Sequence, residues 1–205
     1  MATEFYDALI AAAAPGSDAS DVHVLACILA IGAEECRRGR MPSLSAAVGL
    51  DDATLRALFR RLFPNAAVRL NDFALTPVAR ADDEACLVDL LRQATTSGWL
   101  AAEFLAPMIA RRAQRPDHLW QDLGLRARTE LSALMARHFR VLAARNTRDM
   151  KWKKYLYRTI CGDAGYTLCT APSCAECADF GDCFGDESGE SFLARMRRDG
   201  KTAAA

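Results

Sequence analysis

The sequence predicts an all-α protein, a single helical domain with an irregular C-terminal cysteine-rich loop. Apolar residues recur every three or four positions through most of the 205-residue chain, which is the spacing of amphipathic helices. No stretch shows the alternation of β-branched and polar residues that is typical of a strand. Hydrophobic residues make up 51% of the chain, and a chain of this length can bury many of them in one compact core.

The first 40 residues predict two helices. Apolar residues return at helical spacing in residues 3–13, and Pro15 with Gly16 ends that pattern. Residues 22–40 predict a longer and mostly apolar helix. Acids and capping residues precede it and arginines close it, which is the order of charges that the helix dipole favours.

Two short helices are expected between residues 43 and 64. Ser43 is the expected N-cap of the first helix, and Asp51 or Asp52 that of the second. Pro64 should end the second helix, because proline lacks the amide hydrogen that a helix interior needs.

The rest of the chain predicts six further helical stretches: 82–96, 100–114, 117–124, 126–145, 150–161 and 189–198. The first two should form a hairpin across Ser97 and Gly98. Asp117 is the expected cap of the third, and the apolar stripe of the fourth predicts one continuous helix.

The stretch 150–161 has two distinct faces. Three apolar residues recur every four positions on the face that should meet the core: Trp152, Leu156 and Ile160. Lys151, Lys154 and Arg158 lie on a separate basic face, which could attract an oxyanion or an acidic partner, or could simply be solvated.

The character of the chain changes after residue 161. Residues 162–187 are rich in Gly, Cys, Asp and Pro and are too irregular for a long helix. This divides the chain into a helical body (1–161), a cysteine-rich loop (162–187) and a short C-terminal helix with a tail (188–205). Little apolar surface in the loop can hold it in place, so its order should depend on a bound group.

Charge and the N-terminal sequence indicate where the protein works. Basic and acidic residues balance at 26 each, so the overall charge suggests neither a nucleic-acid nor a membrane partner. Glu4 and Asp7 stand where a signal peptide would be basic. The expected location is therefore the cytoplasm, where thiols stay reduced and disulfides are rare.

Four of the eight cysteines fall within fifteen consecutive positions: Cys169, Cys174, Cys177 and Cys183. Thiolates this close in sequence can converge on one metal centre at little cost in loop-closure entropy. Zinc sites usually have two short pairs separated by a dozen or more residues, whereas this spacing partly matches a ferredoxin ligand set. Spacing alone thus favours an iron–sulfur cluster, with zinc, redox chemistry and coincidence as the alternatives.

Four features before and within this segment carry a resemblance to a known family. They are the stretches "RPDHLWQDLGL", "LSALMARHF" and "NTRDMKWKKYLYRTIC", and the spacing Cys-x4-Cys-x2-Cys-x5-Cys, in which the last cysteine is followed by Phe184. Together they resemble the NifQ family of nitrogenase molybdenum-delivery proteins, most densely over residues 115–185. The combination of the "MKWKK" helix and this cysteine spacing is far more specific than a lone Cys-x2-Cys.

The resemblance implies a carrier protein and not an enzyme. It implies that Cys169, Cys174, Cys177 and Cys183 bind a molybdenum–iron–sulfur cluster and that the protein donates molybdenum for assembly of the nitrogenase iron–molybdenum cofactor. Molybdate would be the metal source. The partners it implies are the cofactor-assembly scaffold and the nitrogenase iron protein.

Two other functions remain open at this point. The same cysteines could hold an iron-only [4Fe–4S] cluster for electron transfer. The two short helices at 43–64 resemble a helix-turn-helix with Arg56, Arg60 and Arg61 on its second helix, which would suit an iron–sulfur DNA-binding regulator.

Several other side chains could contact a metal. Cys161, His118 and His138 are candidates if the fold brings them near the loop, although a packed thiol and capping or core histidines are the plainer interpretation. The remaining thiols lie in helical patterns and are expected to be core or near-surface thiols and not ligands: Cys27, Cys36 and Cys86.

Overall fold

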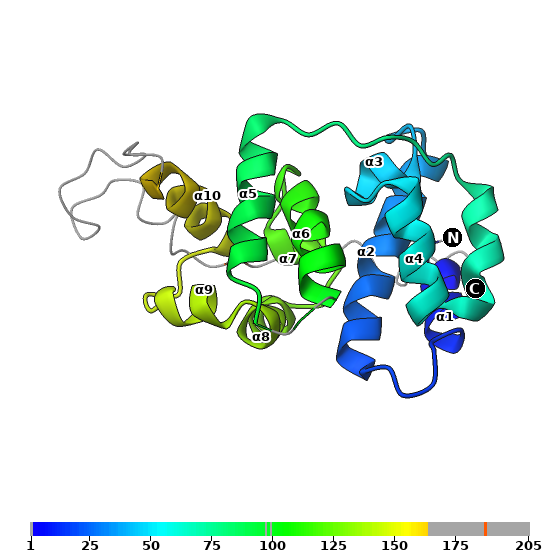
Figure 1. Cartoon of the computed structure of the whole chain (residues 1–205), viewed down its shortest axis with the longest axis horizontal. Coiled ribbons are helices and arrows are strands. Elements are labelled where there is room, and N and C mark those ends of the chain that lie inside the picture. The colour runs from blue at the N-terminus through cyan, green and yellow to red at the C-terminus, as the bar shows by residue number, and fades with distance from the viewer. Residues whose placement is uncertain (1, 97, 99, 164–186, 188–205) are drawn as a thin grey trace, which may run out of the picture.

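The structure is a computed structural model that describes residues 2–96, 98, 100–163 and 187. Within these ranges it is helical with no strand, which confirms the all-α prediction (Figure 1). The predicted helix 189–198 and the four clustered cysteines lie outside them. No helix among the described residues has the length and hydrophobicity needed to cross a membrane.

The N-terminal elements pack around α2 (Ala19–Arg37), which has α1 (Ala2–Ala11) and α3 (Leu44–Val48) as neighbours. Helix α2 begins three residues before the predicted range, where the Asp18 carboxylate accepts the Ser20 and Asp21 amides. Gly32 permits a close approach to α3, since a Cβ there would lie 2.7 Å from Val48 Cγ1.

The caps predicted for the next two helices are confirmed. Ser43 Oγ accepts the Ala46 amide at 3.0 Å at the start of α3, and Asp51 accepts the Thr54 amide at 2.8 Å at the start of α4 (Asp52–Leu62). Asp51, and not Asp52, is therefore the cap. A 3-10 helix, η1 (Pro64–Asp72), follows α4 and was not predicted.

The central hairpin is also confirmed, because α5 (Asp82–Gln93) packs against α6 (Ala106–Ala113). The second arm is less regular than predicted. It begins as a π-helical turn, η2 (Leu100–Leu105), before continuing as α6.

The predicted single helix at 126–145 is wrong. It is two helices, α8 (Arg128–His138) and α9 (Arg140–Arg145), separated at Phe139, whose backbone leaves the helical region with φ −130° and ψ 51°. Phe139 is fully buried, and Thr96 donates to the His138 carbonyl through its amide (2.9 Å) and its hydroxyl (3.1 Å). Tertiary contacts therefore satisfy the carbonyl that the break exposes.

Two smaller corrections concern the last helices. The N-cap of α7 (Leu119–Asp122) is His118, and not Asp117; the amide of His118 donates to Gln121 Oε1 at 3.2 Å. Helix α10 (Trp152–Asp163) begins two residues after the predicted start at 150 and extends two residues beyond the predicted limit at 161.

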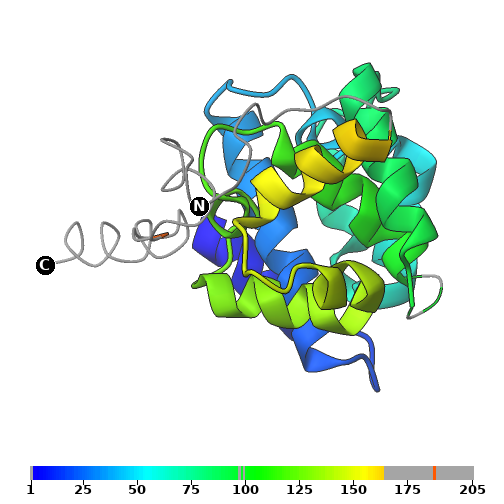
Figure 2. The same ribbon diagram turned by 90° about the vertical axis from the view of Figure 1, so that its left-hand side faces the viewer.

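The helices form one body around a continuous core. Buried apolar residues connect without interruption from Phe5 in α1 to Leu156 in α10. In Figure 1, α1–α4 lie at one end, α5–α7 lie in the middle, and α9 and α10 lie at the other end. The turned view brings α9 and α10 to the front, with α8 beside α9 (Figure 2).

Candidate functional site

The four predicted ligands, Cys169, Cys174, Cys177 and Cys183, lie outside the described residues. Among the residues that are described, no group of three or more His, Cys, Asp or Glu side chains is arranged to hold a metal ion. The structure instead shows how the body holds the two ends of the cysteine segment. These ends are α10, which precedes the segment, and Glu187, which follows it.

The linker before α10 is closed by polar contacts. The Asn146 amide group donates to the Met150 carbonyl and accepts the Met150 amide, both at 2.9 Å. Asp149 between them has a left-handed backbone (φ 53°), which is uncommon for a residue other than glycine. Arg128 at the start of α8 donates to the Asp149 carbonyl and carboxylate, each at 2.8 Å. These contacts fix where α10 begins.

Lys153 ties the first turn of α10 to α7. Its ammonium group donates to the backbone carbonyls of Arg115 and Asp117 and to the carboxylate of Asp122. The side chains are only 18% (Lys153) and 6% (Asp122) exposed. Burial raises the pKa of Asp122 above its ordinary value, and Lys153 opposes that rise.

A second ionic layer lies beneath this contact. The guanidinium of Arg112, 1% exposed, donates to the Asp122 carbonyl at 2.7 Å and makes a two-point contact with Glu35 at 2.7 and 3.0 Å. Arg115 also donates to Glu35, at 3.1 Å. Helices α2, α6 and α7 are thus joined to the start of α10 by compensated charges.

The predicted apolar face of α10 is confirmed. Trp152 and Leu156 are buried, and Ile160 packs against the core while partly exposed. Trp152 also donates to Ser132 Oγ at 3.3 Å. Trp120 in α7 is buried as well.

Glu187 lies against the body near the start of α10. Its carboxylate is 3.6 Å from His118 Nδ1 and 3.5 Å from Arg128 Nε. Beside it is an open pocket of about 500 Å³, formed by residues that precede α7, by α7 and by the start of α10. The pocket is lined by Pro116, Asp117, His118, Leu119, Gln121, Lys151, Lys153, Lys154 and Glu187.

The two ends of the cysteine segment are therefore held at opposite ends of α10. The segment leaves the helix at Asp163, and Glu187 contacts the side chain of Arg128, which also binds the linker before α10. The 12 residues of α10 span about 18 Å at 1.5 Å per residue.

The other metal-ligand candidates have separate environments. His138 is buried and its Nε2 lies 2.8 Å from Asp21 Oδ1, which confirms the interpretation as a core histidine. His118 is half-buried and contacts Glu187, so it lies next to the end of the segment. Cys161 is half-buried in the last turn of α10.

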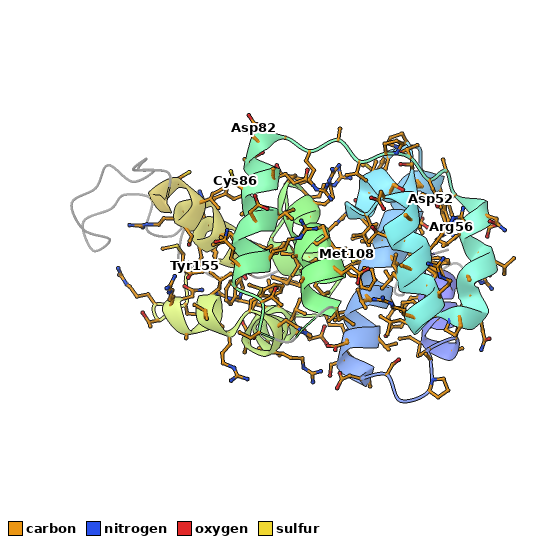
Figure 3. The ribbon with its side chains drawn as sticks, in the orientation of Figure 1. Asp52, Arg56, Asp82, Cys86, Met108 and Tyr155 are labelled. Carbon is orange, nitrogen blue, oxygen red and sulfur yellow. The ribbon has the colours of Figure 1, made fainter. Side chains whose placement is uncertain are left out.

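The three remaining thiols do not share one environment. Cys27 is buried, and Cys36 is half-buried with its pKa raised to about 11 by burial and by the charge of Glu35. Cys86 is exposed on α5 (Figure 3), which fits the near-surface alternative of the prediction.

The arginines of the helix-turn-helix candidate are largely paired. Arg56 contacts Asp52 at 2.6 Å on the same helix (Figure 3), and Arg61 contacts Glu103 at 2.8 Å. Only Arg60 of the three is exposed with no ion pair to the residues that the structure describes. These pairs weaken the case for a phosphate-binding face.

Sequence reasoning missed Glu187, Arg128, Asn146 and the Lys153–Asp122 pair as parts of this site. Asn146 and Lys153 lie inside the stretch "NTRDMKWKK", and Asp122 lies inside "RPDHLWQDLGL". The sequence therefore contained a signal for these residues, because they belong to the stretches that carry the family resemblance. It did not show that the two stretches contact each other, since that depends on the fold.

Comparison with known proteins agrees with the family resemblance that these stretches carry. The chain is 45% identical to the "Protein NifQ homolog" of Sinorhizobium fredii over 174 residues, covering 83% of this chain and 74% of the relative. It is 40% identical to "Protein NifQ" of Rhodobacter capsulatus over 160 residues, covering 78% and 87%. No solved structure matches. The NifQ family model matches residues 24–185, a range that includes all four clustered cysteines, and the chain therefore belongs to the NifQ family.

Proposed function

We propose that this protein carries molybdenum in a Mo–Fe–S cluster and donates it for assembly of the nitrogenase iron–molybdenum cofactor. The observation that carries the proposal is a family match that includes Cys169, Cys174, Cys177 and Cys183 at a spacing suited to cluster binding. The cluster is cargo in this proposal, and the protein is a carrier without a catalytic residue of its own.

The donor set fits such a cargo. Four thiolates are soft ligands that hold iron in sulfide clusters, whereas molybdenum arrives as molybdate, a hard oxyanion. Bridging sulfides can bind both metals. Molybdenum held through sulfide can leave without removal of the thiolates from the iron.

The helical body supports this role by fixing α10. Lys153, Arg128 and Asn146 determine where the helix begins, and Trp152 and Leu156 bury one of its faces in the core. A rigid helix before the first cysteine limits the conformations that the ligand segment has to lose when it binds the cluster.

The basic face of α10 is the proposed point of attraction for molybdate and for an acidic surface of the assembly partners. Lys154 and Arg158 are exposed, and Lys151 and Lys154 line the pocket beside Glu187. Positive charge of this kind raises the rate of encounter with anions and acidic proteins. The partners in this proposal are the cofactor-assembly scaffold and the nitrogenase iron protein, and the place of action is the cytoplasm.

Anaerobic reconstitution tests the proposal. Protein purified without oxygen is supplied with iron, sulfide and molybdate, desalted, and analysed for iron, molybdenum and sulfide together with EPR. The wild type should retain both metals, and Cys177→Ala should lose them. Cys86→Ala is the matched control, because Cys86 is an exposed thiol outside the ligand set and its loss should change nothing.

Three results would contradict the proposal. Wild-type protein that stays colourless would exclude a cluster. Equal metal content in Cys177→Ala would exclude the ligand set. An iron-only product with a reversible one-electron couple would instead indicate an electron-transfer protein. Delivery is tested by mixing the loaded protein with the scaffold under reducing conditions, where molybdenum should move to the scaffold.

A further inference from the structure

Glu187 is unusual because it is a charged residue that is nearly buried just after the cysteine segment. Its side chain is 5% exposed, and it is four residues beyond Cys183. A carboxylate is found at such burial when its charge is compensated. The Arg128 guanidinium supplies the opposite charge, with its Nε 3.5 Å from Oε2, and His118 Nδ1 lies 3.6 Å from Oε1. Neither Glu187 Oε2 nor Arg128 Nε has a hydrogen-bond partner among the described residues, so this contact is electrostatic.

Arg128 serves two parts of the chain at once. Its Nη2 donates to the Asp149 carbonyl, the Asp149 carboxylate and the Met150 carbonyl, so it holds the linker from which α10 starts. Its Nε faces Glu187 from the same guanidinium. The residue that follows the cysteine segment is therefore attached to the point where the helix preceding that segment begins.

We propose that Glu187, Arg128 and His118 form a clasp that positions the cluster-binding segment. The clasp then joins the residue that follows the cysteine segment to the start of the helix that precedes it. Closing a loop in advance lowers the entropy cost of bringing its first and last ligands, Cys169 and Cys183, to one cluster. Glu187 is thus a positioning residue that acts through the backbone and contacts no metal.

The contact between Glu187 and Arg128 differs from an ordinary surface ion pair because both side chains are largely buried. Exposed pairs contribute little because water screens them and two long side chains must be ordered. Here Arg128 is 21% exposed and already held by three other acceptors, so little further ordering is needed. The clasp also has two partners for one carboxylate, and each can be removed separately.

The first experiment uses the metal-free protein, so that it does not depend on a cluster. Hydrogen exchange is measured by mass spectrometry on peptides covering residues 184–190 in the wild type, Glu187→Gln, Arg128→Gln and the double variant. Exchange should rise roughly three- to tenfold in each single variant, and the double variant should show no further rise, since both remove one interaction. Asp89→Asn is the control, because it neutralises an exposed carboxylate on α5, and it should exchange like the wild type.

His118→Gln gives a second, independent measurement if Arg128→Gln lowers the melting temperature. It removes the other partner of Glu187 while leaving the Arg128 contacts to the linker in place, and it should raise exchange in the same peptides. If these peptides exchange at the same rate in Glu187→Gln as in the wild type, the clasp is overturned. Additive effects in the double variant would overturn the pairing of Glu187 with Arg128.

The second experiment tests whether the clasp positions the cluster. This role rests on the proposed function, because it requires that the protein binds a cluster. The reconstituted proteins are mixed with an iron chelator, and the bleaching of the cluster is followed. Glu187→Gln should lose iron roughly three- to tenfold faster than the wild type and Asp89→Asn, at an unchanged melting temperature. Equal rates would overturn the positioning role. If no cluster forms in the wild type, the proposed function fails, while the exchange data still decide whether the clasp exists.

Discussion

Lys153 offers a sharp test of how α10 is held to the body. In Lys153→Met a side chain of similar length fills the same space without charge. The variant removes the donor to the carbonyls of Arg115 and Asp117 and to the carboxylate of Asp122. Asp122, 6% exposed, then keeps its buried charge without the lysine. Lys154→Met is the matched control, because Lys154 is the exposed neighbour on the same helix.

The expected loss follows from the burial of both partners. Removal of one member of a buried ion pair costs about 3–5 kcal/mol, and Arg112 near Asp122 should keep the loss in the lower part of that range. An exposed lysine far from such a pair costs less than about 0.5 kcal/mol. The free energy of unfolding should therefore fall by about 3 kcal/mol in Lys153→Met and hardly change in Lys154→Met.

The pH dependence of this loss has a definite sign. Burial raises the pKa of Asp122 in the folded protein, and loss of Lys153 should raise it further. A group whose folded pKa is raised stabilises the fold below its unfolded pKa, and this contribution is lost as pH rises through the folded value. The defect of Lys153→Met should thus be largest at neutral pH and shrink toward pH 4.

Urea unfolding of the metal-free protein, followed by circular dichroism at 222 nm at several pH values, measures both effects. Lys153→Met/Asp122→Asn should recover part of the loss at neutral pH, because the variant no longer buries an unpaired charge. A loss below about 1 kcal/mol in Lys153→Met, or a loss that grows as pH falls, would refute the reasoning.

Three further predictions concern the body and its surface. Gly32→Ala should lower the free energy of unfolding by about 1–2 kcal/mol, because the added Cβ would lie 2.7 Å from Val48 Cγ1. Gly162→Ala in α10 is the control, because a Cβ there meets nothing within 4 Å, and it should be neutral or stabilising in the same urea titration. Asp51→Ala should cost about 1 kcal/mol at pH 7. Hydrogen bonds from Thr54 lower the pKa of Asp51 in the folded protein. The stability that Asp51 contributes is therefore present above its unfolded pKa and disappears as pH falls through its folded pKa. Thermal melts of the wild type, Asp51→Ala and Asp51→Asn at several pH values measure this, and a loss of stability that does not change with pH would contradict it. Lys154→Glu should weaken binding to the cofactor-assembly scaffold, with a loss that shrinks as salt rises, while Arg69→Glu on η1 makes the same charge change elsewhere and should bind normally; equal binding of both variants would exclude the basic face as a contact.

The sequence by itself determined the features that depend on near neighbours. The helical class follows from apolar spacing, and the caps at Ser43 and Asp51 follow from bonds to amides three residues away. The buried face of α10 follows from the four-residue recurrence of Trp152 and Leu156. The cysteine spacing that led to the family is also local. Such features lie within a turn or two of chain, where residue type and spacing largely decide the outcome.

Only the tertiary structure decided the features that join distant parts of the chain. The helix break at Phe139 depends on Thr96, whose hydroxyl reaches a carbonyl 42 positions away, and nothing in the pattern of residues 126–145 signals it. Lys153 finds Asp122 31 positions away, and His138 finds Asp21 117 positions away. Glu187 contacts His118 and Arg128 from beyond the cysteine segment. A buried charge needs a partner, but which partner it meets is set by how the helices pack, and packing is a property of the whole chain.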